Sequence, residues 1–137
     1  MRHIVLVGHA RFAEGMASAA WLITGKKVPF FNAYLEGKED FKPELSEYLA
    51  KLPKEDEVVL LTDLFGGSVN NDILAAYRSK DRIHIVTGTN LALILGLLFA
   101  DEGTDTETVI RQCIAEAREG MCYGNDLSLD DTELDEF

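Results

Sequence analysis

The sequence predicts an α/β domain, with a doubly wound, mostly parallel sheet of about four strands and helices on both faces. The first observation behind this is that short apolar runs typical of strands alternate with helix-like segments four times. The second is that these runs are continuously apolar, as expected for a parallel sheet covered on both faces. A chain of 137 residues fits one such domain and can bury a sizeable core without disulfides or metals.

The beginning of the chain has the pattern of a strand–helix–strand unit. Residues 3–7 (HIVLV) are a β-branched apolar run, which predicts the first strand. Over residues 12–24 the apolar side chains recur at helical spacing, and Gly25 is a suitable helix stop. The next apolar run, residues 28–35 (VPFFNAYL), predicts the second strand. We expect the two strands to be parallel because a helix connects them.

The middle of the chain repeats this alternation. Residues 40–52 carry an apolar stripe at helical spacing and are followed by Pro53, which cannot continue a helix. Residues 57–62 (EVVLLT) predict the third strand, and residues 68–79 predict the helix that follows it. This part therefore adds one more strand to the same sheet.

The last elements are one strand and two helices. Residues 83–87 (IHIVT) predict the fourth strand, and residues 91–100 predict a strongly apolar helix. Thr104 and Glu107 have the spacing of a capping box, which predicts a final helix over residues 105–119.

Negative charge is concentrated at the C-terminal end of the chain. The formal net charge is −11, and residues 125–137 contain six acidic residues and no basic one. Residues 1–124 are therefore a moderately acidic domain of net charge −5, followed by an acidic tail whose DLSL segment could add a short edge strand. Nucleic acids and anionic membranes require a basic surface, so we expect neither as a direct partner.

The spacing of the cysteines bears on metal and redox sites, and the lengths of the apolar runs bear on the cellular location of the protein. Cys113 and Cys122 are nine residues apart, which matches no zinc or redox motif, and Cys113 falls on the apolar side of the last helix. The N-terminus lacks the apolar run of a signal peptide. The longest apolar stretch, LALILGLLFA, has ten residues, too few to span a bilayer. We therefore expect a cytoplasmic protein that requires no metal and no cofactor.

Polar residues follow three of the predicted strands. His9 comes at the end of the first strand, Asp63 at the end of the third, and residues 87–90 (TGTN) at the end of the fourth. In doubly wound sheets the ligand site lies outside the carboxyl ends of the strands. We therefore expect His9 and Asp63 to meet at one edge of the sheet if their strands are neighbours.

This edge has the residue types needed to accept a phosphoryl group. His9 and Asp63 are candidate catalytic residues, because a carboxylate bonded to one ring nitrogen leaves the other as a nucleophile. Gly67 and Ser68 are candidate phosphate-binding residues. Glycines let the backbone approach a ligand, Ser68 suits a helix N-cap, and free N–H groups at a helix start favour anions. Arg11 is a further candidate phosphate contact.

Each of these features also has a simpler interpretation. Asp63 could cap a loop, Gly-Gly-Ser is often a turn followed by a helix cap, and Arg11 could be a solvated side chain. Ser68 could instead be a hydrolase nucleophile with His9 and Asp63, although the segment lacks the G-x-S-x-G pattern of a nucleophile elbow. The chain has neither a P-loop nor G-x-G-x-x-G, so no nucleotide is implied.

Three segments together resemble a known family. VGHARFAEGM, LLTDLFGGSVNN and VTGTNLALIL are similar, in order and approximate spacing, to three signature stretches of the IIA domain of the mannose family of the bacterial phosphoenolpyruvate-dependent sugar phosphotransferase system. The resemblance covers about residues 1–124. It implies a doubly wound α/β domain that forms a homodimer, often with a C-terminal strand exchanged between subunits. MCYGNDLSL is where such a strand would lie.

The resemblance also implies a reaction and assigns roles in it. In this family, the histidine of the first signature accepts a phosphoryl group from the histidine-containing phosphocarrier protein. It passes the group to a IIB domain, which phosphorylates the sugar at the membrane IIC/IID components. His9 matches that histidine, Asp63 the residue that orients it, and Ser68 the residue that holds the phosphate. The IIB partner would be a separate protein, no metal is required, and any membrane contact is indirect, through IIC/IID.

The chain departs from the family pattern close to these residues. Ala10 stands where the family has glycine, and Val69 and Ala92 stand where it has proline. These changes alter the local backbone and bear on the choice of partner. Two other roles remain open: a IIA-like phosphoryl donor to a dihydroxyacetone kinase, and a regulatory interaction module whose acidic tail is a docking segment.

Overall fold

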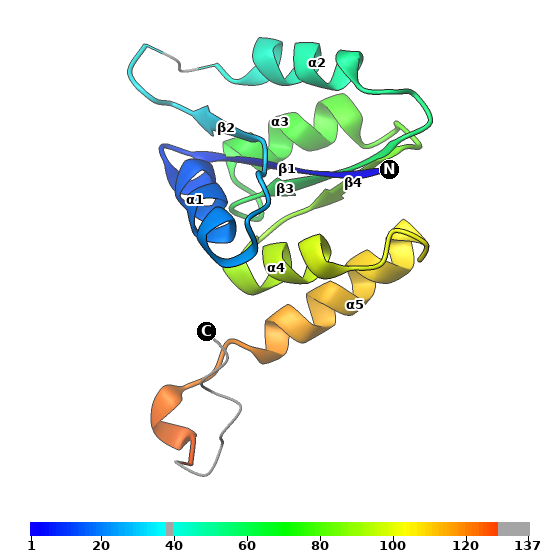
Figure 1. The fold of residues 1–137 in the computed structure, drawn as a ribbon. Coiled ribbons are helices and arrows are strands. Elements are labelled where there is room, and N and C mark those ends of the chain that lie inside the picture. Colours follow the sequence, from blue (N-terminus) through cyan, green and yellow to red (C-terminus); the bar gives the residue numbers. More distant parts are fainter. Residues whose placement is uncertain (38–39, 129–137) are drawn as a thin grey trace.

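Four parallel strands form a sheet between two layers of helices in the computed structural model, which describes residues 1–37 and 40–128 (Figure 1). The strands are β1 (Arg2–His9), β2 (Phe30–Ala33), β3 (Glu57–Thr62) and β4 (Ile83–Val86). Their spatial order is β2-β1-β3-β4, and every pairing is parallel. This confirms the predicted doubly wound α/β class and makes β1 and β3 neighbours at the centre of the sheet.

The helices divide between the two faces of the sheet. They are α1 (Phe12–Thr24), α2 (Lys42–Lys51), α3 (Ser68–Tyr77), α4 (Leu91–Phe99) and α5 (Thr106–Glu119). Side chains of α1, α4 and α5 share one buried cluster, and side chains of α2 and α3 share another. Two helical layers therefore cover the sheet, as right-handed strand–helix–strand connections require.

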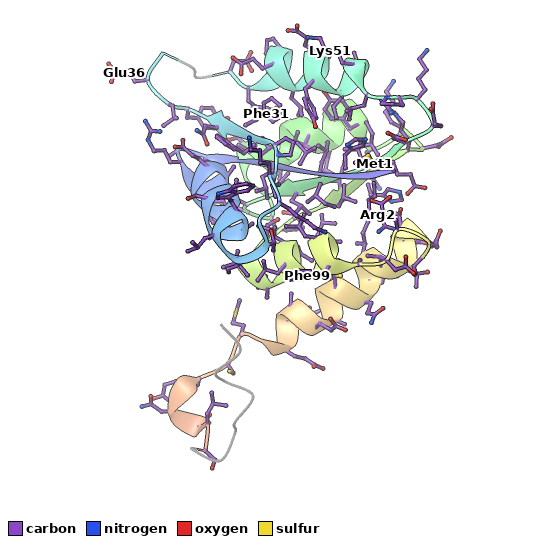
Figure 2. The ribbon with its side chains drawn as sticks, viewed as in Figure 1. Met1, Arg2, Phe31, Glu36, Lys51 and Phe99 are labelled. Carbon is purple, nitrogen blue, oxygen red and sulfur yellow. The ribbon has the colours of Figure 1, made fainter. Side chains whose placement is uncertain are left out.

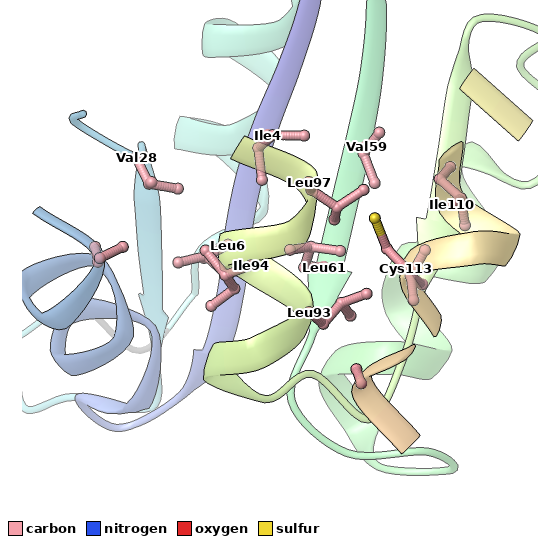
Figure 3. Packing of buried hydrophobic residues seen from close by; sticks show 14 of the residues in the cluster. Ile4, Leu6, Val28, Val59, Leu61, Leu93, Ile94, Leu97, Ile110 and Cys113 are labelled. Atoms are coloured by element: carbon pink, nitrogen blue, oxygen red, sulfur yellow. The ribbon is translucent and has the colours of Figure 1, made fainter. Parts of the chain in front are cut away.

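The central strands contribute side chains to both cores because successive residues of a strand point to opposite faces. In β1, Leu6 packs in the cluster of α1, α4 and α5, whereas Val5 and Val7 pack in the cluster of α2 and α3. Figure 3 shows the first cluster, in which apolar side chains of α4 lie over β1 and β3 and contact α5. Cys113 is buried in this cluster, as its position in the sequence predicted.

The second strand is shorter than the predicted range of residues 28–35. β2 covers only Phe30–Ala33, because Pro29 has no N–H to donate to a ladder and Tyr34 turns the chain with a φ of 63°. The predicted start of the last helix is also corrected. The residue before α5 that accepts from the backbone N of Thr108 is Asp105, at 3.1 Å, so Asp105 is the cap and not Thr104.

Arg2 joins the start of β1 to the connection between α4 and α5. Its side chain extends toward α5 in Figure 2. Its Nε donates to Thr106 Oγ1 at 3.1 Å, and its guanidinium also donates to the backbone carbonyls of Asp101 and Thr104. Arg2 therefore links the amino-terminal end of β1 to the segment around the start of α5. The candidate site lies at the opposite, carboxyl-terminal ends of the strands.

The chain leaves the sheet after α5. Residues 121–128 are all exposed and include a short 3₁₀ helix, η1 (Gly124–Asp126), which lies away from the domain in Figure 1. No strand forms in the described part of the DLSL segment, since no sheet edge lies beside it there; Leu129 and the rest of the tail lie outside the described residues. Among the helices described, none has both the length and the apolar character needed to cross a membrane.

Candidate active site

His9 and Asp63 meet at the carboxyl edge of the sheet. β1 and β3 are paired so that Val7 lies opposite Thr62, which brings the two following segments side by side. Asp63 Oδ2 is 2.8 Å from His9 Nδ1 and accepts the backbone N–H of His9 at 2.7 Å. One carboxylate oxygen therefore fixes both the ring and the backbone of His9.

The pairing with Asp63 selects the tautomer of His9. An ionised carboxylate accepts but does not donate, so the ring proton lies on Nδ1 and the lone pair lies on Nε2. Nε2 has no hydrogen-bond partner in the part of the chain that the structure describes. The His9 side chain is 38% exposed and that of Asp63 only 10%, so a reactant can approach the ring while the carboxylate stays behind it.

The other two histidines are paired with carboxylates in a different way. His3 uses Nε2 to contact Asp56 Oδ2 at 2.9 Å, and His84 uses Nε2 to contact Glu57 Oε2 at 3.2 Å. The hydrogen bond from His3 is the largest cause that lowers the pKa of Asp56, and the N-terminal ammonium at 3.2 Å lowers it further. His9 is thus the histidine whose Nδ1 is held and whose Nε2 is left open.

Gly8 allows the close approach of Asp63 to β1. A Cβ atom at Gly8 would lie 3.1 Å from Phe12 Cδ1 and 3.3 Å from Asp63 Oδ2. A side chain at this position would therefore press on the carboxylate oxygen that holds His9. Any larger residue before the histidine would require the Phe12 ring and the Asp63 carboxylate to shift by a few tenths of an ångström.

The loop after Asp63 brings backbone against the imidazole. Gly66 has a φ of 78°, which turns the chain sharply, and a Cβ atom at Gly67 would lie 3.4 Å from His9 Cε1. Gly67, not Ser68 as predicted, is the N-cap of α3, and Ser68 is the first helical residue. The shift of one residue arises because the extended backbone of Gly67 (φ −77°, ψ 165°) already precedes the first turn.

The helices that begin beside His9 have no side-chain caps. Neither α1 nor α3 has a capping side chain, whereas Asn90 caps α4 and Asp105 caps α5. Uncapped N–H groups and the positive end of the helix dipole favour an anion. The two helix starts at the site can therefore receive negative charge near His9.

Ser68 is bonded to a residue that the sequence analysis did not single out. The phenol of Tyr34 donates to Ser68 Oγ at 2.8 Å, and the Tyr34 ring centroid lies 5.5 Å from that of His9. Between Ser68 and His9 no hydrogen bond is found within the described residues, so the relay of a serine hydrolase is not assembled here. The available signal for Tyr34 was its place at the carboxyl end of a strand, the same edge as His9.

Arg11 is held beside the site by Glu14. Its guanidinium contacts Glu14 Oε1 at 2.9 Å, and the same oxygen accepts from Asn32 Nδ2 at 2.9 Å. Arg11 is well exposed, and such surface ion pairs contribute little stability. To contact phosphate, the guanidinium of Arg11 would exchange the Glu14 carboxylate for a phosphate oxygen. This contact stays a prediction.

Metal ligation has no support in the geometry of this region. Across residues 1–37 and 40–128, no three or more His, Cys, Asp or Glu side chains are grouped so that they could hold a metal ion.

Comparisons with known proteins identify the family of this chain. Residues 3–114 match the family model EIIA-man, described as PTS system fructose IIA component. The PTS system fructose-specific EIIA component of Bacillus subtilis (strain 168) is 28% identical over 103 residues, which are 72% of this chain and 69% of that protein.

Solved structures extend the similarity to the whole domain. A Klebsiella pneumoniae protein assigned to a phosphoenolpyruvate-dependent sugar phosphotransferase system is 33% identical, with a TM-score of 0.82 over 91% of this chain and 92% of that chain. The PTS IIA protein associated with the fucose utilization operon of Streptococcus pneumoniae is 26% identical, with a TM-score of 0.70 over 90% and 93%. The chain belongs to the mannose-type EIIA family, and it is a IIA component, with a phosphotransferase role, of the sugar phosphotransferase system.

Proposed function

We propose that this IIA component accepts a phosphoryl group on Nε2 of His9 from the histidine-containing phosphocarrier protein and passes it to a separate IIB protein in the cytoplasm. The observation that carries the proposal is the contact between His9 Nδ1 and Asp63 Oδ2 at 2.8 Å. It leaves Nε2 of a partly exposed imidazole open to a reactant at the carboxyl ends of the parallel strands. His3 and His84 do not offer this, because His3 lies at the start of β1, His84 lies within β4, and their side chains are only 16% and 27% exposed.

The transfer step follows from this tautomer. The Nε2 lone pair attacks the phosphorus of the donor's phosphohistidine and forms the new N–P bond. The donor's N–P bond breaks, and its ring nitrogen keeps the electron pair. Because His9 keeps the proton on Nδ1, its ring becomes positively charged, and the Asp63 carboxylate stabilises that charge. In the second step His9 is the leaving group and the IIB protein supplies the nucleophile.

Helix starts and polar side chains can both stabilise the negative charge of the phosphoryl group. The uncapped starts of α1 and α3 provide N–H groups and the positive ends of two helix dipoles. Ser68, the first residue of α3, adds a hydroxyl that can donate to a phosphoryl oxygen, and Arg11 adds a nearby cation. The helix N–H groups are held in place by the fold before the phosphoryl group arrives, which keeps their reorganisation small.

The rim of the site favours a protein as the donor. Leu64 and Phe65, in the loop after Asp63, are 59% and 73% exposed, and Tyr34 is about half exposed. Exposed aromatic and aliphatic side chains around a catalytic group are typical of the centre of a protein interface. Small phosphorylated metabolites would not need this apolar rim.

We also infer that the chain works as a homodimer that exchanges its C-terminal strand. β4 pairs with β3 on one side, and no described strand occupies its other edge. A groove of about 380 Å³ between β4 and α5 is lined by isoleucine side chains (Ile85, Ile110 and Ile114) and by polar and charged residues of the same two elements. Met121 and Tyr123, just beyond α5, are exposed apolar residues of the kind that a strand on the partner's β4 would bury.

The function is tested by phosphorylating the purified chain with phosphoenolpyruvate and the general phosphotransfer proteins. We expect the mass of one phosphoryl group to be added, and the adduct to be lost in acid, as a phosphoramidate is. His9→Ala should abolish the adduct. His84→Ala, which removes another histidine paired with a carboxylate, should leave it unchanged. Phosphate retained by His9→Ala would refute the assignment of the nucleophile.

The acceptor is identified by a second transfer. The phosphorylated chain is mixed either with a IIB protein or with the nucleotide-bearing subunit of a dihydroxyacetone kinase, and loss of phosphate from His9 is followed. We expect rapid transfer to IIB. Transfer only to the kinase subunit would replace the transport role by the kinase role. Transfer to neither protein would favour the regulatory role.

A further inference from the structure

Tyr34 is held in an unusual conformation directly beside the candidate site. In the described part of the chain, Tyr34 and Ala10 are the non-glycine residues with positive φ, at 63° and 49°. The register of β1 and β2 places Ala33 opposite His9, and the N–H of Ala10 donates to the carbonyl of Ala33 at 2.8 Å. Such conformations are unfavourable for residues with a Cβ and persist where the surrounding contacts require them.

The side chain of Tyr34 contacts both functional residues at once. Its ring is inclined by 40° to the imidazole of His9, with the centroids 5.5 Å apart. Its phenol donates to Ser68 Oγ at 2.8 Å. These contacts join β1, the end of β2 and the start of α3, three segments that are distant in the sequence.

The direction of this hydrogen bond determines what Ser68 can do. A serine hydroxyl has one donor and two acceptor positions. When Tyr34 Oη–H occupies an acceptor position, the hydrogen of Ser68 remains free to point at a group on His9 Nε2. A donated hydrogen bond also polarises the hydroxyl that receives it and strengthens the bond that this hydroxyl makes next.

We propose that Tyr34 is a positioning residue of the phosphoryl site: its phenol orients the Ser68 hydroxyl so that this hydroxyl donates to the phosphoryl group on His9. The inference rests on the proposed function, since it requires phosphoryl transfer to His9. It adds a hydrogen-bonded pair, Tyr34 and Ser68, to the pair formed by His9 and Asp63. Tyr34 acts through Ser68 and forms no bond to the reacting atoms.

The test compares Tyr34→Phe, Ser68→Ala and the double variant in the rate of phosphoryl transfer to His9. Tyr34→Phe keeps the ring against His9 and removes only the donor. From the usual contribution of one hydrogen bond, we expect the rate to fall about 3- to 10-fold. Ser68→Ala should reduce it at least as much, and the double variant should be no slower than Ser68→Ala, because both changes remove the same interaction.

Two phosphoryl donors distinguish a positioning role of Tyr34 from a role in docking the donor protein. The rates are measured with the phosphorylated carrier protein and with phosphoramidate, a small donor that needs no protein interface. We expect the same fold decrease with both donors. A decrease with the protein donor alone would make Tyr34 a docking residue, and multiplicative effects in the double variant would uncouple it from Ser68. Either result overturns the proposal.

Tyr77→Phe is the matched control, because Tyr77 is the last residue of α3, at the end of the helix away from Ser68, and its phenol is also hydrogen-bonded to a serine, Ser46 of α2. It should leave the transfer rate unchanged. If wild-type protein gains no phosphate on His9 from either donor, the proposed function itself fails. If wild type is phosphorylated and Tyr34→Phe is equally fast, only the role of Tyr34 is refuted.

Discussion

At the scale of single residues, the histidines differ in which ring nitrogen contacts a carboxylate. All three histidines contact carboxylates between 2.8 and 3.2 Å. His3 and His84 are held through Nε2, whereas His9 is held through Nδ1 by an oxygen that also binds its backbone N–H. A histidine beside a carboxylate is therefore not informative by itself. The proposal that His9 is the nucleophile rests on its open Nε2 and on its exposure at the carboxyl ends of the strands.

Asp56 should make the domain sensitive to acid. Its pKa is lowered from 3.8, mainly by the hydrogen bond from His3 and further by the N-terminal ammonium, against the effect of burial. A carboxyl whose folded pKa is lowered stabilises the protein above its unfolded pKa, and this stabilisation is lost as pH falls through the folded pKa. We therefore expect Asp56→Asn to lower the free energy of unfolding at pH 7 and to differ less from wild type in acid.

Urea unfolding of the two proteins between pH 7 and about pH 3 measures this difference. Asp72→Asn is the control, since its carboxylate is partly exposed and lies 3.9 Å from Lys42 Nζ. That variant should stay close to wild type at each pH. A deficit of Asp56→Asn that is constant or larger in acid would show that the carboxylate charge is not the cause.

At the scale of elements, the strand-to-helix turns carry the strain of the site. The turn from β1 to α1 passes through Ala10 with a φ of 49°, and the turn from β3 to α3 passes through Gly66 with a φ of 78°. The same conformation is therefore filled once by glycine and once by alanine. The alanine is unfavourable there because its Cβ approaches the following carbonyl oxygen.

Exchanging the two residue types should change stability in opposite directions. Ala10→Gly relieves about 1–2 kcal/mol of strain but loses about 0.5–1 kcal/mol to the greater freedom of the unfolded chain, so we expect a gain of up to about 1.5 kcal/mol. Gly66→Ala should lose up to about 1.5 kcal/mol, because the same two terms then act with opposite sign. Thermal or urea unfolding of both variants measures the changes. A loss of stability in Ala10→Gly would show that the strain at this turn is negligible.

Element boundaries illustrate how far local sequence patterns reach. The helix and strand types follow from apolar periodicity. Within the described residues, each of the four strands and five α-helices overlaps the range that the sequence predicted for it. The ends of β2 and the caps of α3 and α5 differ by one or more residues. These ends depend on which backbone group finds a partner, and the partner often belongs to another element.

At the scale of the whole molecule, no described strand lies beside the outer edge of β4, and residues 121–128 after α5 are exposed. The proposed dimer would place this segment of one subunit beside β4 of the other, next to the groove between β4 and α5. Sedimentation of the full chain should show a dimer. A chain ending at residue 120 should be a monomer at the same concentration, because it lacks the strand that would complete the partner's sheet.

A chain ending at residue 128 is the matched control, since it loses most of the acidic tail but keeps the segment after α5. It should remain a dimer. If truncation at residue 120 preserves the dimer, another surface forms the interface. If truncation at residue 128 already abolishes it, the required contacts lie in residues 129–137. Far-UV circular dichroism of each chain checks that the domain is folded.

The sequence by itself determined the alternation of strands and helices, the two covered faces of the sheet, and the placement of His9 and Asp63 at strand ends. These properties depend on periodicity and on neighbours along the chain, which are visible in a list of residues. The tertiary structure alone decided that β1 and β3 are adjacent, that Nδ1 and not Nε2 of His9 contacts Asp63, and that Tyr34 reaches Ser68. Each of these depends on which strands pair and in what register, and that choice is made by packing between segments far apart in the sequence.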